Sequence, residues 1–427
     1  MNNPFRTART KMISFLILFL ITIFLSACLL DTLIGAIPFI TKEDVYQESS
    51  EDQAQQLQPS KTATTTKTAV PKSSATPTVI VTATTVPINN PVSGLPVKDP
   101  DSLKLPPAMV AISNFPVSVR PQAGLSFAPL VYEFYTGEGM TRLLAFFYGD
   151  MPDINGPLTE IGPVHTGRLP DEGLRQLYQG FLVNSGASDN VARNLFYDTS
   201  LIAKTDAEIG KMMVTSERLN SIARAEREEL DEMSDRGMHF DAAIPPNGMP
   251  AESFWLMYSY PNQIIWRYDP TSGAYHRYQD KGDATTFVRL DDRLTGEPLT
   301  FENVIIFLAQ HEAIYASLID LKFTFFEKEP AVLLRDGQLY KIYWSTRNIA
   351  QSSSEGKASP LRFINYDGDL FPLKPGQTWV EIVQPGAAYW ESVDADVYFD
   401  RATKVQEGSG HWSLVYEPPG AILDTPE

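Results

Sequence analysis

The chain has 427 residues, a formal net charge of −17 at pH 7, and 43% apolar and 11% aromatic residues. The acidic excess argues against nucleic-acid binding, which needs a basic face. The length allows two or three domains, and the apolar content is enough to build packed cores. Because there is a single cysteine, no intramolecular disulfide can form.

The N-terminus has the pattern of a targeting segment. Basic residues up to Lys11 precede the apolar run 12–25, which is followed by Ser26, Ala27 and Cys28. This resembles the lipobox of bacterial lipoproteins, in which the cysteine is lipidated and becomes the new N-terminus. The alternative is an uncleaved signal anchor, because apolar residues continue beyond Cys28. Both place the remaining chain outside the cytoplasm. We expect 1–28 to be a lipoprotein signal peptide and Cys28 the lipidation site.

The next segment, 29–90, changes sharply in composition. From Thr41 onward Ser, Thr, Pro, Gln and Lys dominate, and no aromatic residue follows Tyr46 before residue 90. Such a segment buries too little surface to offset the entropy of ordering it. We predict a disordered tether that holds a folded head away from the membrane.

A first folded region, 91–243, mixes strand and helix patterns. Apolar runs bounded by Gly and Pro turns indicate buried strands, and acidic residues after Pro170 indicate a helix start. The region therefore predicts an α/β sheet domain. The expected strands are 109–113, 130–135, 143–148 and 181–184, and the expected helices are 171–179, 189–196 and 217–233.

A second region, 250–390, is β-rich, and we read 391–427 as a tail or a short extra hairpin. Asp336-Gly337 and Asp367-Gly368 each lie between apolar or aromatic runs, which is a strong hairpin signal. The predicted class is α+β, with an N-terminal mixed α/β sheet domain followed by a β-rich C-terminal domain. The expected strands are 255–260, 264–268, 274–278, 304–309 and 378–383.

Aromatic side chains alternate along the first strands of the second region. They predict either a stacking face for glycans or ordinary sheet packing, and the enrichment of aromatics in strands favours packing. They are Trp255, Tyr258, Tyr260, Trp266, Tyr268, Tyr275 and Tyr278.

Candidate binding residues lie at the ends of the strands in 108–168, where binding sites usually form. Glu133 stands inside an apolar strand, which is costly unless it is paired, and Arg142 or Arg168 is its natural partner. This set is a structural ion pair, a polar groove for a carboxylate, phosphate or sugar, or an acid/base catalyst. The tentative ligand-binding set is Asn114, Arg120, Glu133, Arg142, His165, Arg168 and Ser185.

Two further features are weaker. His165 sits in a Pro/Gly loop without a nucleophile motif nearby, so we interpret it as a loop or groove histidine. Ser185 lies in the strand-to-helix turn 184–188, where amides and hydroxyls could hold an anion. P-loop and nucleophile-elbow motifs are missing, and the alternative that Ser188 is simply a helix cap is favoured. The histidines are scattered and form no metal-ligand spacing, so we predict no metal and no cofactor.

Four phrases resemble a known family. PVSGLP (91–96), the stretch 120–147, EIGPVHTGR (160–168) and LKPGQTWVEIV (373–383) look like the YerB-like bacterial lipoproteins, built from N- and C-terminal domains of unknown function (DUF3048). The sequence departs from the family pattern where His165 replaces an arginine, and where Lys211 to Val214 replaces a Pro-His-Asn motif. The resemblance implies a two-domain architecture and an extracytoplasmic, membrane-anchored location, and it implies no enzymatic reaction.

Together these features predict a lipid-anchored extracytoplasmic protein that acts as a binding or scaffold module at the cell envelope. The expected partners are the membrane, through the lipid, and a cell-wall polymer, a glycan or an envelope protein. The alternative is an envelope hydrolase or transferase that uses Glu133 or His165 with Arg142 and Arg168. A purely structural spacer is the third hypothesis.

Overall fold

The computed structural model describes residues 87–197, 202–204, 213–225, 238–315, 317–322, 328–346 and 361–419. They belong to one compact unit, Thr82–Glu427. The predicted signal peptide, Cys28 and nearly all of the predicted tether lie outside the described residues. No helix within the described ranges has the length and apolar character needed to cross a bilayer.

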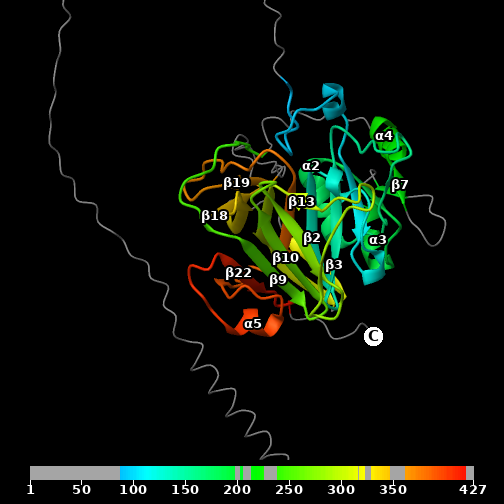
Figure 1. The fold of residues 1–427 in the computed structure, drawn as a ribbon. Coiled ribbons are helices and arrows are strands. Elements are labelled where there is room, and N and C mark those ends of the chain that lie inside the picture. Colours follow the sequence, from blue (N-terminus) through cyan, green and yellow to red (C-terminus); the bar gives the residue numbers. More distant parts are fainter. Residues whose placement is uncertain are drawn as a thin grey trace, which may run out of the picture. The chain divides into compact units, whose positions relative to one another are not determined.

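A large central sheet contains strands from both predicted regions (Figure 1). Strands β2 (Leu130–Gly137) and β20 (Thr378–Val383) pair in parallel, so the two regions meet inside one sheet. Every residue of these two strands is buried, which explains their nearly continuous apolar sequences. Outward from β20, the strands are β14 (Asn303–Leu308), β17 (Glu329–Arg335), β18 (Gln338–Ser345) and β19 (Arg362–Ile364), and β8 (Met249–Pro250) also pairs with β18. Outward from β2, they are β3 (Met140–Phe147), β1 (Ala108–Ser113), β5 (Phe181–Asn184) and β6 (Ile202–Lys204).

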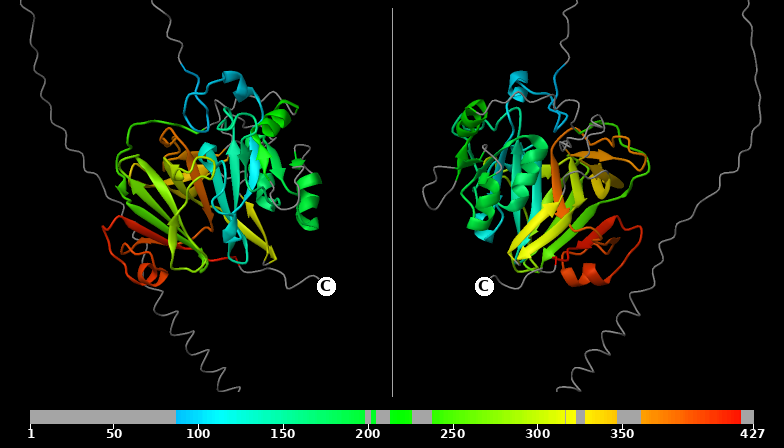
Figure 2. Two further views of the ribbon diagram at one scale, coloured as in Figure 1. Left: turned by 45° about the vertical axis from the view of Figure 1, so that its right-hand side comes forward. Right: turned by 180° about the vertical axis from the view of Figure 1, so that it is seen from behind.

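A second sheet covers one face of the central sheet (Figure 2). Trp266 of the second sheet packs against Trp379 of β20 with ring centroids 5.4 Å apart, and Phe301 lies 5.1 Å from Trp379. Its strands, in order, are β12 (Phe287–Arg289), β11 (Ala274–Asp280), β10 (Asn262–Asp269), β9 (Ser253–Ser259), β22 (His411–Val415) and β21 (Tyr389–Glu391), with β13 (Thr300–Phe301) beside β11.

Helix α2 (Leu169–Tyr178) covers the opposite face of the central sheet. The hydroxyls of Tyr132 in β2 and Tyr178 in α2 lie 2.6 Å apart. The left view of Figure 2 shows the second sheet, the central sheet and the helices as successive layers. The remaining elements are α3 (Asp189–Tyr197), α4 (Ser216–Ala225), α5 (Tyr398–Thr403), the 3-10 turns η1 (Pro100–Lys104), η2 (Val117–Val119) and η3 (Leu125–Phe127), and the pairs β15 (Gln310–Tyr315) with β16 (Leu318–Lys322) and β4 (Glu160–Ile161) with β7 (Val214–Thr215).

The predicted α+β class, with a β-rich C-terminal region, is confirmed. The strands expected at 181–184 and 378–383 match β5 and β20 residue for residue, and the helices expected at 171–179 and 189–196 are α2 and α3. The helix expected at 217–233 is α4 in its first part, and its remainder lies outside the described residues.

The hairpin at Asp336-Gly337 is confirmed. Both residues have positive φ, 53° and 69°, and they join β17 to β18. Asp367-Gly368 also forms a turn, but only a single bridge, between Ile364 and Leu370, closes it, and among the described residues no second strand pairs with β19 there. The range 391–427 contains α5 and β22, and β22 pairs in parallel with β9 as part of the second sheet.

The aromatic side chains of the second sheet mainly form its core. Trp255, Trp266 and Tyr275 are 0% exposed and Tyr258 is 2% exposed, which confirms the packing interpretation for these four. Tyr260, in contrast, is exposed.

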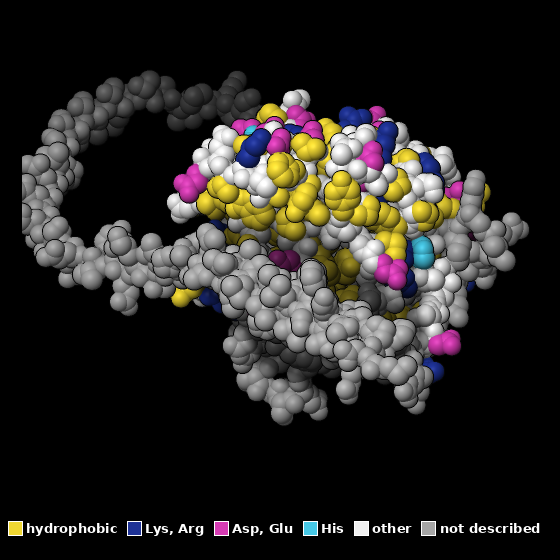
Figure 3. Space-filling view, turned by 90° about the horizontal axis from the view of Figure 1, so that it is seen from below, with side chains coloured by type: hydrophobic (Ala, Val, Ile, Leu, Met, Phe, Trp, Pro, Cys, Tyr) yellow, Lys and Arg dark blue, Asp and Glu magenta, His cyan; other side chains and the backbone are white. Residues whose placement is uncertain are grey.

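Seen from below, hydrophobic side chains gather in a band on the surface, with charged side chains toward its edge (Figure 3).

Candidate functional site

The strand register separates the predicted site residues into two groups. In the pairing of β2 with β3, Glu133 lies opposite Leu143, and Phe134 lies opposite Arg142. Successive residues of a strand point to opposite faces of a sheet. Glu133 and Arg142 therefore lie on opposite faces, and the prediction that Glu133 forms one set with Arg142 and Arg168 is wrong.

Glu133 belongs to a buried ion-pair network between the two sheets. Arg277 of β11 donates from Nη2 to Glu133 Oε2 at 2.6 Å and from Nη1 to Glu381 Oε1 at 3.0 Å. The three charged side chains are 0–1% exposed. Glu133 Oε1 also accepts hydrogen bonds from Thr141 Oγ1 at 2.6 Å and Asn114 Nδ2 at 3.0 Å. Glu133 thus has an arginine partner, as a buried carboxylate requires, but that partner is Arg277.

Asn114 and Arg120 extend this network toward the second sheet. Arg120 Nε donates to the Asn114 carbonyl at 3.0 Å, and its Nη1 donates to the Asp280 carbonyl at 2.9 Å. Asn114 is fully buried. In the described structure these two predicted binding residues join the loop after β1 to β11.

The ion pairs of Arg277 set two carboxyl groups against one guanidinium. Burial and the charge of Glu133 raise the pKa of Glu381, while Arg277 acts in the opposite direction. Trp266 Nε1 and the Tyr258 hydroxyl donate to Glu381 at 2.9 Å and 3.1 Å. Because the site is dry and the carboxylates repel each other, it favours a proton on Glu381.

The second group of predicted residues lies at the carboxyl ends of β1 and β5. His165 N donates to the Ala111 carbonyl at 2.8 Å, and Ser185 N donates to the His165 carbonyl at 3.0 Å. These bonds fix the loop that leads into α2. At the start of α2, Arg168 N donates to Asp171 Oδ2 at 2.8 Å. The structure therefore brings His165, Arg168 and Ser185 to one end of the sheet.

This end of the sheet holds buried polar atoms that lack a partner. Arg142 is 6% exposed, and Asp171 and Asn184 are each 1% exposed. The register places Arg142 and Asn184 on the same face, across β1 from each other. Among the described residues at this end of the sheet, the buried side-chain atoms without a hydrogen-bond partner are Arg142 Nε and Nη1, Arg168 Nε, Asn184 Nδ2 and Asp171 Oδ1. Four donors stand against one acceptor, which suits a ligand rich in acceptor oxygens.

The charges at this site act on one another. Burial, and then the charge of Arg168, lower the pKa of Arg142 to about 9, while Asp171 acts in the opposite direction. With that pKa Arg142 is still protonated at neutral pH, but nearby negative groups compensate its positive charge poorly. The N-terminus of α2, a helix of 10 residues, adds partial positive charge beside it. The site is electropositive and poorly neutralised from within.

His165 is a neutral member of this group. Its Nδ1 accepts a hydrogen bond from Thr166 N at 2.7 Å, which places the ring proton on Nε2. Burial, and then Arg142 and Arg168, lower the pKa of His165 to about 4. A histidine with this pKa is a weak base at neutral pH, so the geometry favours a hydrogen-bond donor over a general base.

Asp171 makes the site sensitive to pH. Burial raises the pKa of Asp171 to about 7, against the opposing effects of the Arg168 backbone N–H and Arg142. Above this pH a negative charge appears beside the arginines, so we expect affinity for sulfate, whose charge is constant in this range, to fall about tenfold between pH 6 and pH 8. Calorimetric titration at both values measures the change. Asp171→Asn is expected to remove it, and an unchanged pH profile in that variant would contradict the assignment.

Sequence reasoning missed three residues that the structure makes central, Asp171, Arg277 and Glu381, and it included Asn184 only as part of the turn 184–188. Glu381 carried the same signal as Glu133, a carboxylate within an apolar strand. Asp171 appeared only as an acidic residue in the first turn of a helix. Arg277 carried no local signal, since it lies 144 residues from Glu133. The substituted motif at 211–214 lies partly outside the described residues.

Comparisons with known proteins agree with this architecture. Residues 92–229 match the "Protein of unknown function (DUF3048) N-terminal domain", and residues 256–380 match the corresponding C-terminal domain. The chain is 27% identical over 299 residues to the protein named "Putative lipoprotein YerB" of Bacillus subtilis (strain 168), covering 65% of this chain and 81% of that protein.

The fold is similar to a solved structure. The crystal structure of the YerB protein from Bacillus subtilis superimposes with a TM-score of 0.55 at 22% identity, covering 69% of this chain and 96% of that chain. The two matched sequence ranges together span more than half of the chain, in the expected order. The chain therefore belongs to the YerB-like family of lipoproteins, whose two halves are the DUF3048 N-terminal and C-terminal domains.

Proposed function

We propose that this lipoprotein is an extracytoplasmic binding protein whose folded head holds an anionic group at Arg142 and Arg168. In this proposal a lipid on Cys28 anchors the chain to the membrane, and residues 29–90 form a disordered tether. The head engages a cell-wall polymer, a glycan or another envelope protein through a carboxylate or phosphate. Membership of a lipoprotein family supports the anchor, and the unpaired donors support the anion.

The observation that carries the proposal is the buried guanidinium of Arg142. Two of its nitrogens are buried without a partner in the described residues, and the side chain is 6% exposed. Removing a cation from water is costly unless an anion or hydrogen-bond acceptors compensate. A bound carboxylate or phosphate would accept from Arg142 and Arg168 together, in the bidentate geometry that arginine favours.

The proposal is tested by calorimetric titration of the full chain in detergent at pH 6. The probes are inorganic phosphate, citrate and purified cell-wall fragments. We expect saturable binding of at least one probe, and at least tenfold weaker binding in Arg168→Gln, because each charge-assisted contact contributes on the order of 1.4 kcal/mol or more.

Arg218→Gln is the matched control, since Arg218 is an exposed arginine on α4. This variant removes the same charge and should leave affinity unchanged within about twofold, because exposed charges are screened. Equal weakening by both variants would indicate general electrostatic attraction. The absence of saturable binding by all three probes would overturn the proposal.

The structure weighs against the alternative of a hydrolase or transferase that uses Glu133 or His165. Glu133 is fully buried and paired with Arg277, so within the described structure its carboxylate has no access to a substrate. His165 remains beside Arg142 and Arg168, but its lowered pKa disfavours base catalysis at neutral pH. We therefore place binding, rather than hydrolysis or transfer, as the function that this geometry supports best.

A further inference from the structure

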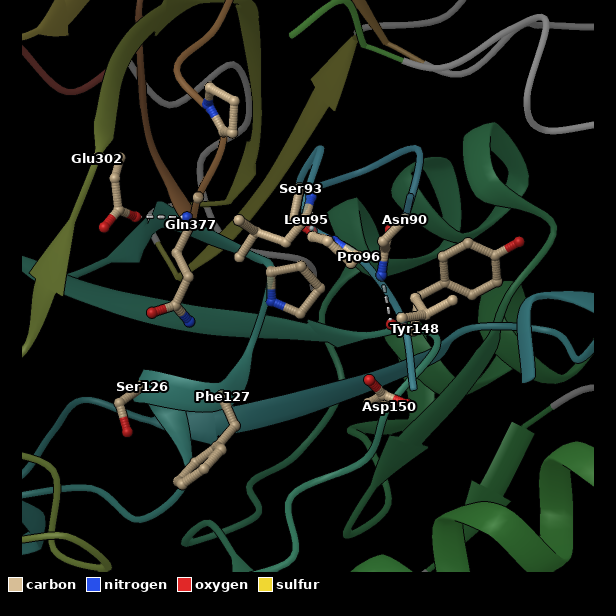
Figure 4. Close-up of a pocket in the computed structure, with 14 residues that line it drawn as sticks. Asn90, Ser93, Leu95, Pro96, Ser126, Phe127, Tyr148, Asp150, Glu302 and Gln377 are labelled. Carbon is tan, nitrogen blue, oxygen red and sulfur yellow. Dashed lines mark hydrogen bonds between the residues drawn. The ribbon is translucent and has the colours of Figure 1, made fainter. Parts of the chain in front are cut away.

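A separate cavity lies at the other end of the central sheet. It has a volume of about 340 Å³ and is lined by the segment 90–97, by η3, and by residues next to the amino ends of β2, β14 and β20 (Figure 4). Arg142 lies near the carboxyl end of β2. At about 3.3 Å per residue, the length of β2 puts on the order of 15 Å or more between the two places. The cavity is therefore independent of the anion site.

The cavity walls are built by contacts between segments far apart in the chain. Gly376 N donates to the Ser93 carbonyl at 2.8 Å, and Thr378 N donates to the Pro129 carbonyl at 3.0 Å. The first bond joins the segment that follows the predicted tether to the turn before β20, and the second joins the amino ends of β2 and β20. The cavity is thus preformed, as small-ligand sites usually are.

The side chains around the cavity present acceptors. Figure 4 shows Glu302 and Asp150 on different sides of it. Glu302 Oε2 accepts from Gln377 N at 2.6 Å, and Asp150 Oδ2 accepts from Lys98 N at 2.9 Å. No hydrogen bond among the described residues uses the second oxygen of either carboxylate. Both oxygens remain available to a ligand.

Three polar side chains around the cavity already donate hydrogen bonds within the fold. Asn90 Nδ2 donates to the Tyr148 carbonyl at 2.7 Å, and Gln377 Nε2 donates to the Ala128 carbonyl at 2.7 Å. Ser126 Oγ donates to Asp292 Oδ2, in the loop between β12 and β13, at 2.8 Å. None of the described residues that line the cavity is Lys, Arg or His. A ligand that fits this lining donates hydrogen bonds and carries positive charge.

Glu302 is held rigidly in the wall. A Cβ atom at Gly376 would lie 2.2 Å from Glu302 Oε2, so only glycine allows the carboxylate to rest against this turn. Gly376 also has a φ of +146°. The hydrogen bond from Gln377 N orients the carboxylate before any ligand arrives, which limits the entropy lost on binding.

The remaining lining is apolar. Leu95, Pro96, Phe127, Pro129 and Pro375 contribute hydrocarbon surface to the cavity. Asp150 also lines a neighbouring cavity of about 700 Å³, so the first cavity adjoins further accessible volume at this residue. The combination of two carboxylates with an apolar wall suits an ammonium group on an aliphatic stem.

We propose that this cavity binds a primary amine carried on a short aliphatic chain, with Glu302 and Asp150 as carboxylates that attract the positive charge from different sides of the cavity. The chemistry is shared by free diamines and by lysine-like side chains of peptides. The carboxylates supply charge and acceptors, and the prolines and Phe127 pack against the methylene groups.

The test is calorimetric titration of the full chain in detergent with 1,5-diaminopentane, Nα-acetyl-lysine amide and, as a neutral isostere, 1,5-pentanediol. We expect both amines to bind and the diol to bind at least tenfold more weakly. Glu302→Gln and Asp150→Asn keep side-chain shape and the acceptor for the backbone amide, and each should weaken amine binding about tenfold, or roughly 1.4 kcal/mol. Preference for the diamine over the lysine derivative would indicate a free diamine, and the reverse a peptide side chain.

The matched control is Glu407→Gln, which removes an exposed carboxylate from the loop before β22 and should change amine affinity by less than twofold. Phosphate affinity should not change in Glu302→Gln, so the outcome is separate from that of the anion site. Equal binding of the diol and the amines, or amine binding unaffected by both cavity variants, would overturn the proposal.

Discussion

Replacing Arg277 with methionine is expected to destabilise the folded head by about 3–5 kcal/mol. Arg277 pairs with Glu133 at 2.6 Å and Glu381 at 3.0 Å, and all three side chains are 0–1% exposed. The variant leaves two carboxyl groups facing each other in a dry site. The Arg277 guanidinium also lies 4.4 Å from the centre of the Trp379 ring, so the variant loses this packing contact between the sheets as well. Urea unfolding of the full chain measures the change.

The control for this variant is Arg289→Met. Arg289 pairs with Asp291 at 2.9 Å, but the two side chains are 44% and 38% exposed, so this loss should be about 0–1 kcal/mol. A combined Arg277→Met, Glu133→Gln, Glu381→Gln variant should recover much of the stability, because it removes the uncompensated charge. A loss below about 1 kcal/mol in Arg277→Met would show that the network does not hold the sheets together.

The same network gives stability a defined pH dependence. The raised pKa of Glu381 means that the folded state binds a proton more tightly than the unfolded state. Its contribution is fully present below the ordinary glutamate pKa and is lost as pH rises through the higher folded value. The Arg277→Met defect should accordingly be larger at pH 8 than at pH 5, because Glu381 loses its proton as the pH rises and the variant has no guanidinium to compensate that charge.

Replacing Arg142 with methionine is expected to have the opposite effect on stability. Arg142 is nearly as buried as Arg277, but its Nε and Nη1 have no hydrogen-bond partner in the described structure. Methionine keeps the length of the side chain and removes an uncompensated charge, so we expect the ligand-free protein to gain about 1–2 kcal/mol. Phosphate or citrate affinity should fall at least tenfold in the same variant. Thermal unfolding and calorimetric titration measure the two effects.

The two readouts together distinguish a binding residue from a structural one. A residue kept for binding shows increased stability with lost affinity, whereas a structural residue loses both. Arg142→Lys keeps the charge but loses the forked donor geometry, and it should bind with intermediate affinity. A loss of more than about 1 kcal/mol of stability in Arg142→Met would assign Arg142 to the core and remove the main support for the anion site.

The contrast between these arginines follows from the layers of the fold. Arg277 projects from the second sheet onto the central sheet, where Glu133, Glu381 and Trp379 all contact its guanidinium. Arg142 lies on the helix-covered face, near the carboxyl ends of the parallel strands β1 and β5. Strand ends in open sheets leave room for ligands, whereas the middle of a sandwich does not. Equal burial therefore has different consequences for the two residues.

The sequence by itself determined the local elements of this protein. Strand β5 and strand β20 follow from apolar runs bounded by turn residues, and α2 follows from its proline and acidic first turn. The hairpin at Asp336-Gly337 follows because both residues tolerate positive φ. The sequence also showed that Glu133, a carboxylate in an apolar strand, needed a cation. These features depend on residues near one another in the chain.

The cation that pairs with Glu133, and the sheet face on which each charged residue lies, follow from the tertiary structure. The register between β2 and β3 puts Glu133 and Arg142 on opposite faces, and a shift of one residue would reverse this. The pairing of β2 with β20 joins the two sequence regions in one sheet, and β11 then brings Arg277 to Glu133 across 144 residues. No local pattern encodes such long-range pairings, because they depend on the packing of whole layers.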